Sequence, residues 1–140
     1  MKNQSASFIF LMADDDADDC LLAESAFEEA KIDGEIRFIS DGRELMEYLQ
    51  SEGERIREKL PPADLILLDL NMPRKDGREA LKEIKSDSRL KRIPVVILST
   101  SKEEKDDKFC RDLGVCGFMV KPVMFEEWIE AFKSLTKHLL

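Results

Sequence analysis

The chain has 140 residues, of which 43% are hydrophobic and 37% charged, and its formal net charge is −8 at pH 7. This composition is typical of a folded globular domain, and the negative charge argues against a nucleic-acid-binding protein, which needs a basic surface. No apolar run approaches the roughly 20 residues of a membrane span, so we expect no membrane-embedded segment.

Three cysteines and one histidine limit the chemistry that this chain can perform. Cys20, Cys110 and Cys116 are odd in number and lack C-x-x-C spacing, so we expect reduced side chains in a cytoplasmic protein. His138 is the one histidine and lies near the end of the chain. Metal sites and nucleophiles that depend on histidine are therefore nearly excluded.

Five strand patterns alternate with five helical patterns along the chain. The expected strands are 7–13, 36–39, 65–68, 93–98 and 117–120. The expected helices run from the aspartates after the first strand to about residue 31, from 42 to 49, from just after 77, from about 103 to 113, and from about 125 to the C-terminus. Residues 1–6 are polar and expected to be disordered, and 7–140 are expected to form one domain without an output domain.

The third expected strand, 65–68, decides the fold class. It is apolar at every position, and such a strand must be covered on both faces, as in a parallel sheet flanked by helices. Alternation of strands and helices implies right-handed crossovers that place helices on both faces. Arg37 gives the second strand a polar position, which suggests a sheet edge. The sequence therefore predicts an α/β domain with a five-stranded parallel sheet.

Polar side chains that can bind a ligand or take part in chemistry closely follow the first, third, fourth and fifth expected strands. They are Asp14, Asp15, Asp69, Asn71, Ser99, Thr100 and Lys121. In an open α/β sheet the carboxyl ends of the strands share one edge, and ligands bind there. Three carboxylates at one edge repel one another unless a cation is present, and their oxygen atoms suit Mg²⁺. A nucleophilic carboxylate, a Mg²⁺ ion and a lysine together can receive a phosphoryl group.

Each of these side chains also has an ordinary structural role to weigh. Asp69 can start a turn after its strand, and Ser99 or one of Asp16, Asp18 and Asp19 can cap a helix. Lys121 can be a surface lysine. The convergence of these residue types on one edge, each after a separate strand, favours a shared site.

The motifs resemble the receiver domain of two-component response regulators, over essentially the whole chain. They are Asp14-Asp15, Asp69-Leu70-Asn71-Met72-Pro73 with Asp76-Gly77, Ser99-Thr100, and Phe118 through Lys121-Pro122. The resemblance implies a flavodoxin-like (βα)5 fold with strand order 2-1-3-4-5. It also implies that a sensor histidine kinase or a phosphotransfer protein donates a phosphoryl group to the domain, which then signals to a downstream protein.

The resemblance assigns a role to each residue of the edge. Asp69 would be the phosphoacceptor, and Lys121 would bond the phosphoryl group. The Mg²⁺ ligands would be Asp14, acting directly or through water, Asp15, Asp69, and the backbone carbonyl of Asn71. Ser99, Thr100 and Phe118 would form the conformational switch. Ser99 replaces the commoner Thr, and Phe118 replaces the commoner Tyr, so this switch has no phenolic hydrogen bond.

Four longer stretches, 67–77, 93–96, 99–101 and 121–123, resemble the stand-alone receivers associated with phytochromes. This likeness implies a phytochrome-type photoreceptor kinase and a homodimer formed by the expected fourth and fifth helices. Two other functions stay open. A Mg²⁺-dependent phosphatase would want a carboxylate at position 71, where this chain has Asn. An adaptor that works without phosphorylation would not need the complete set of residues.

Overall fold

The computed structural model describes residues 8–51, 62–72, 74–100 and 108–139. The strands are β1 (Phe8–Ala13), β2 (Gly34–Ile39), β3 (Leu65–Asp69), β4 (Val95–Ser99) and β5 (Gly117–Val120). The helices are α1 (Ala17–Glu29), α2 (Gly42–Ser51), α4 (Gly77–Ser86), α5 (Lys108–Asp112) and α6 (Phe125–Leu139). The predicted alternation of strands and helices is confirmed.

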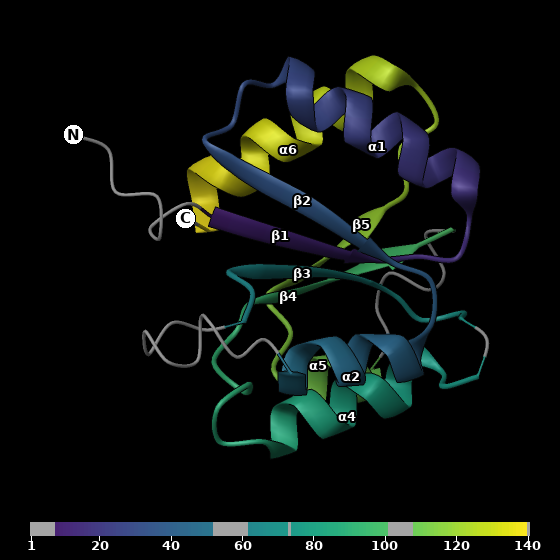
Figure 1. Ribbon diagram of the computed structural model, residues 1–140, viewed down its shortest axis with the longest axis vertical. Coiled ribbons are helices and arrows are strands. Elements are labelled where there is room, and N and C mark those ends of the chain that lie inside the picture. The colour runs from purple at the N-terminus through teal and green to yellow at the C-terminus, as the bar shows by residue number, and fades with distance from the viewer. Residues whose placement is uncertain (1–7, 52–61, 73, 101–107, 140) are drawn as a thin grey trace.

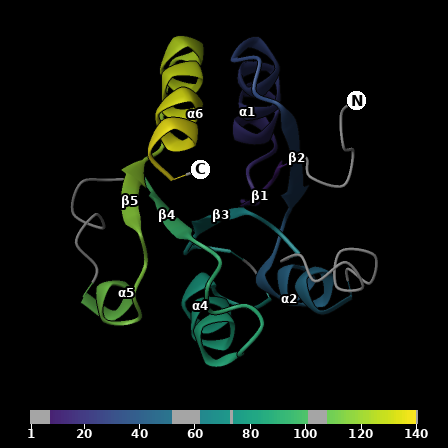
Figure 2. The same ribbon diagram turned by 90° about the vertical axis from the view of Figure 1, so that its left-hand side faces the viewer.

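The five strands form one parallel sheet in the order β2-β1-β3-β4-β5. Helices α1 and α6 cover one face of the sheet, and α2, α4 and α5 cover the other (Figures 1 and 2). This is the flavodoxin-like arrangement that the sequence predicts. Strand β2 lies at the edge of the sheet, as its polar residue Arg37 suggested. All five carboxyl ends point to the same edge of the sheet.

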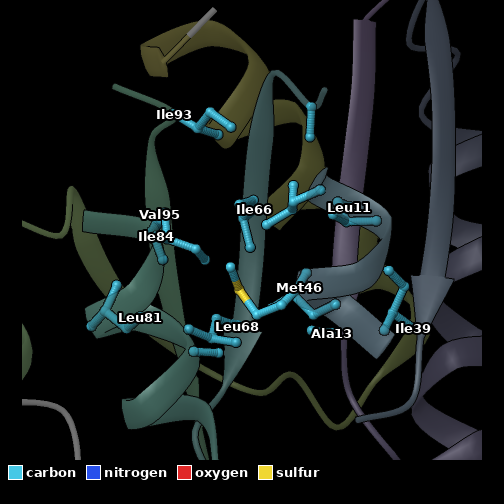
Figure 3. Close-up of a cluster of buried hydrophobic side chains, with 14 of the residues drawn as sticks. Leu11, Ala13, Ile39, Met46, Ile66, Leu68, Leu81, Ile84, Ile93 and Val95 are labelled. Carbon is cyan, nitrogen blue, oxygen red and sulfur yellow. The ribbon is translucent and has the colours of Figure 1, made fainter. Parts of the chain in front are cut away.

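Alternation along the buried strands supplies a hydrophobic core to each face. In β3, Ile66 and Leu68 pack with α2 and α4, whereas Leu65 and Leu67 pack with α1 and α6. All four side chains are fully buried. Figure 3 shows the first core, in which Ile66 and Leu68 lie beside Met46 of α2 and Leu81 and Ile84 of α4. Burial on both faces explains why the strand is apolar at every position.

The second core is built from aromatic rings. The rings of Phe10, Phe27 and Phe132 meet edge to face, with centroids 5.1 to 6.1 Å apart, and Trp128 stacks on Phe132 at 6.0 Å. The side chains of Trp128 and Phe132 are fully buried. These two residues of α6 therefore belong to the core.

Some boundaries differ from the sequence-based expectation. Helix α1 ends at Glu29 instead of about residue 31, because Lys31 adopts a left-handed conformation with φ 56° and turns the chain. Strand β2 begins at Gly34, two residues early, since Gly34 already pairs with Phe8 of β1. Strand β4 begins at Val95, two residues late. The expected disordered residues 1–6 and the first part of the expected helix at 103–113 lie outside the described residues.

The start of α2 packs directly against the loop that follows β3. A Cβ atom at Gly42 would lie 2.0 Å from the carbonyl oxygen of Lys75, so this position has no room for a side chain. Next to it, the buried carboxylate of Asp41 accepts a hydrogen bond from the Glu44 amide at 2.8 Å and pairs with Arg74 at 3.3 Å. These contacts hold the loop through which the chain leaves β3.

We predict that Gly42→Ala lowers the free energy of unfolding by about 1 to 3 kcal/mol, because backbone atoms must move to admit the methyl group. Urea unfolding followed by circular dichroism measures the change. Gly117→Ala is the matched control: a Cβ there meets no atom within 4 Å, and we expect a much smaller effect. Equal stability of the Gly42 variant and wild type would contradict the close approach.

Candidate functional site

Asp69 is the last residue of β3 and is held from two sides. The residue is only 4% exposed, and its Oδ1 accepts a hydrogen bond from the Asn71 amide at 2.9 Å. Helix α4 begins against the strand end: a Cβ at Gly77 would lie 2.5 Å from the Asp69 carbonyl oxygen, and the Gly77 amide donates to Leu70 at 3.0 Å. Rigid elements therefore fix the carboxylate in position.

Asp14 and Asp15 follow β1 on the neighbouring strand. The Asp14 amide donates to Ile39 of β2 at 2.9 Å, and its Oδ1 accepts from the Asp16 amide at 2.9 Å. Asp14 is 2% exposed, whereas Asp15 is exposed. The chain then enters α1, where Asp16 is the N-cap and accepts hydrogen bonds from the amides of Asp18 and Asp19. Of the candidate caps for this helix, Asp16 is the one in place.

Lys121 reaches this edge from the end of β5. Its amide donates to Ser99 of β4 at 2.8 Å, which fixes the start of the side chain. Its Nζ lies 2.9 Å from Asp14 Oδ2 and 3.0 Å from Asp69 Oδ2. Burial alone lowers the pKa of Lys121, but the contacts with Asp14 and Asp69 outweigh burial and raise the pKa above its ordinary value. Lys121 is therefore a fixed positive charge.

A fourth carboxylate, which the sequence patterns did not identify as part of the site, also contacts Lys121. Asp19 Oδ2 lies 3.3 Å from Nζ, although the two residues are 102 positions apart. Asp19 is the third residue after the N-cap of α1, a position where acidic residues ordinarily serve the helix dipole. Its spacing after the cap puts it in the first turn, but its direction toward the sheet edge depends on how α1 packs.

The predicted switch residues lie around the same edge but differ in environment. Ser99 ends β4 and is 1% exposed, and Thr100 follows it as an exposed residue. Phe118 of β5 is half-buried and packs against the core on the side of α2, α4 and α5. Asn71 is exposed and touches the site through its backbone amide. The structure thus brings Asp14, Asp15, Asp69 and Lys121 together, with the remaining predicted residues on their border.

The donor set fits a divalent cation. Oxygen atoms of Asp14, Asp15 and Asp69 lie within 4.8 Å of one another. Asp14 Oδ2 is a buried oxygen that accepts no hydrogen bond of regular geometry, so its contact with Lys121 is ionic and its lone pairs stay available. Burial raises the pKa of Asp14, which means that the negative charge here is under-compensated. Hard oxygen ligands of this kind suit Mg²⁺ or Mn²⁺.

The chain matches a known family along most of its length. Residues 10–133 match the response regulator receiver domain. The chain belongs to this family. Response regulator Rcp1 of Synechocystis sp. is 42% identical over 113 residues, which cover 81% of this chain and 76% of Rcp1. The resemblance to receiver domains is therefore confirmed.

Two solved structures extend the likeness to the fold. The phosphorylated cyanobacterial phytochrome response regulator RcpA has a TM-score of 0.80 at 40% identity, covering 96% of this chain and 94% of RcpA. The Mn²⁺-bound form of Rcp1 has a TM-score of 0.76 at 37% identity, covering 94% and 93%. The predicted relationship to phytochrome-associated response regulators is confirmed. Within the described ranges, no helix is long and apolar enough to cross a membrane.

We predict that Asp14→Asn raises the free energy of unfolding at neutral pH without divalent metal, on the order of 1 kcal/mol. Burial raises the pKa of Asp14 above the 3.8 of an exposed carboxyl, so ionisation destabilises the folded state. This penalty is present above the folded pKa, fades as the pH falls through it and is absent below 3.8. The gain from the substitution should disappear over the same range.

Urea unfolding between neutral and acid pH, in a chelating buffer, measures this dependence. Asp18→Asn is the matched control, because Asp18 is exposed in the first turn of α1 and its removal weakens only helix capping charge. A loss of stability in Asp14→Asn at neutral pH would show that the contact with Lys121 outweighs burial.

Proposed function

We propose that Asp69 receives a phosphoryl group from a sensor histidine kinase or a phosphotransfer protein. An Asp69 oxygen forms a bond to phosphorus while the phosphorus–nitrogen bond of the phosphohistidine breaks, and the electron pair stays on the imidazole nitrogen. The observation that carries the proposal is the placement of the Asp69 carboxylate 3.0 Å from Lys121 Nζ and beside two further carboxylates. This combination provides a nucleophile, a fixed cation and a metal-binding set.

The residues of the edge divide the work between them. Lys121 neutralises charge on the transferred phosphoryl oxygens, for which its raised pKa keeps it protonated. The carboxylates of Asp14, Asp15 and Asp69, with the backbone carbonyl of Asn71, would hold Mg²⁺, with Asp14 binding directly or through water. The metal ion supplies electrostatic stabilisation of the phosphoryl charge when it is bound. Asp69 and Asp14 are almost inaccessible to solvent, which strengthens these electrostatic interactions.

The signal leaves the site through Ser99, Thr100 and Phe118. A phosphoryl group on Asp69 offers new acceptor oxygens, and the hydroxyl of Ser99, at the end of the adjacent strand β4, turns toward them. The half-buried ring of Phe118 on β5 then moves into the space that the Ser99 side chain has vacated. The outcome is a changed surface on α5, β5 and α6 for a downstream protein. This is a packing switch that a local change of charge biases.

The similarity to Rcp1 and RcpA suggests the input. RcpA is a phytochrome response regulator, and we propose a phytochrome-type photoreceptor kinase as the phosphoryl donor of this chain. The protein would work in the cytoplasm, without binding nucleic acid or membrane. The surface of α5, β5 and α6 would also form a homodimer. Phe109 and Val120 leave apolar side chains exposed there, at 43% and 36%.

We predict that the purified protein gains one phosphoryl group from acetyl phosphate in the presence of Mg²⁺ and that Asp69→Asn gains none. Intact-mass spectrometry measures the gain, and alkaline hydroxylamine should remove it because an acyl phosphate is labile. Asp76→Asn is the control, since Asp76 is an exposed helix cap in the same loop. Equal phosphate uptake by Asp69→Asn and wild type would contradict the assignment of Asp69 as the phosphoacceptor. Uptake by neither would favour an adaptor.

We predict that Mg²⁺ or Mn²⁺ raises the melting temperature of the wild type and that Asp15→Asn removes most of the increase. Ligand binding to the native state stabilises it by about 2.7 kcal/mol at a free concentration a hundredfold above Kd. Asp15 is exposed, so its substitution removes a metal ligand with little effect on the metal-free fold. Asp18→Asn keeps the response if the site is local. An identical Mg²⁺ response in Asp15→Asn would remove this residue from the ligand set.

A further inference from the structure

Lys121 is surrounded by as many carboxylates as it has donors. An ammonium group carries three N–H donors and no acceptor. Its partners here are Asp14 at 2.9 Å, Asp69 at 3.0 Å and Asp19 at 3.3 Å. A phosphoryl oxygen that approaches Lys121 therefore competes with these carboxylates for the ammonium group, which donates hydrogen bonds to Asp69 and Asp19.

The three partners differ in how easily they can be released. The side chains of Asp14 and Asp69 are 0% and 5% exposed, and each uses its other oxygen to accept a backbone amide. Asp19 is 23% exposed and has the longest contact. Water can replace the ammonium at Asp19 at small cost, whereas a buried carboxylate that loses its partner pays the full cost of desolvation. Asp19 is the partner that can leave.

We propose that Asp19 is a positioning residue that occupies one donor of Lys121 in the unphosphorylated protein and yields it to a phosphoryl oxygen on Asp69. This inference rests on the proposed function and adds a residue outside the predicted site. It places α1 in the reaction, because the exchange releases the first turn of α1 from the end of β5. Asp19 thus competes with the incoming phosphoryl group for the same cation.

Competition has a consequence with a definite sign. Removing the Asp19 carboxylate leaves a Lys121 donor that already points toward the exposed rim of the site. Asp19→Asn should therefore take up phosphate faster than wild type, by roughly two- to fivefold, the size expected for a partly exposed ion pair. Damage to the structure would have the opposite effect, since it slows the reaction.

The experiment measures the initial rate of phosphoryl uptake from acetyl phosphate at saturating Mg²⁺ by intact mass. Asp18→Asn is the matched control: it loses the same charge from the same helical turn, and its side chain is exposed. Asp19→Glu restores the carboxylate with a longer reach and should return the rate to that of wild type. The rates are repeated at about 1 M KCl, where the Debye length is only ~3 Å and interactions between separated charges are screened.

The proposal holds if Asp19→Asn is faster than both Asp18→Asn and Asp19→Glu and keeps that advantage in high salt. It is overturned if Asp18→Asn accelerates uptake equally, if Asp19→Glu is as fast as Asp19→Asn, or if the advantage vanishes in salt, which reveals a general charge effect. Absence of uptake by the wild type rejects the proposed function itself. Uptake by the wild type with equal rates in all variants rejects the role of Asp19 alone.

Discussion

The structure depends on an ammonium group held among carboxylates at the edge where parallel strands end. Lys121 contacts Asp14 after β1, Asp69 at the end of β3 and Asp19 in α1. Charges brought so close in a nearly solvent-inaccessible environment interact strongly. The pKa of Asp14 is raised and that of Lys121 is raised as well, so the lysine only partly offsets the burial of negative charge.

The fold holds these charged side chains in fixed positions relative to one another. Strands buried on both faces leave no freedom to slide, because a shift by one residue would exchange the two cores. The loop after β3 is fixed by two glycines whose missing side chains admit backbone atoms, Gly42 against Lys75 and Gly77 against Asp69. Asp41 adds an ion pair to Arg74 in the same loop. These contacts fix the backbone on both sides of Asp69.

Much of this arrangement can be predicted from the sequence, because it follows from local patterns. The apolar run at 65–68 requires a sheet covered on both faces, and the polar residues after each strand then share an edge. Asp19 could not be predicted, since its orientation depends on how α1 packs against α6. The partnership of Asp41 with Arg74 links two loops and has no local signature. The early start of β2 at Gly34 was missed because pairing with β1 overrides the low strand propensity of glycine.

The charge balance at this edge makes the site responsive. Four carboxylates, those of Asp14, Asp15, Asp19 and Asp69, gather near the ammonium of Lys121 within the described part of the chain. A divalent cation bound here would reduce the excess negative charge, and the proposed phosphoryl group on Asp69 would restore it, so electrostatics would couple the two events. Lys121 would respond to both, because its Nζ contacts Asp69 and its amide donates to Ser99 of β4. Any redistribution of its three contacts would therefore involve α1, which carries Asp19, and the ends of β4 and β5, which Lys121 joins through its amide.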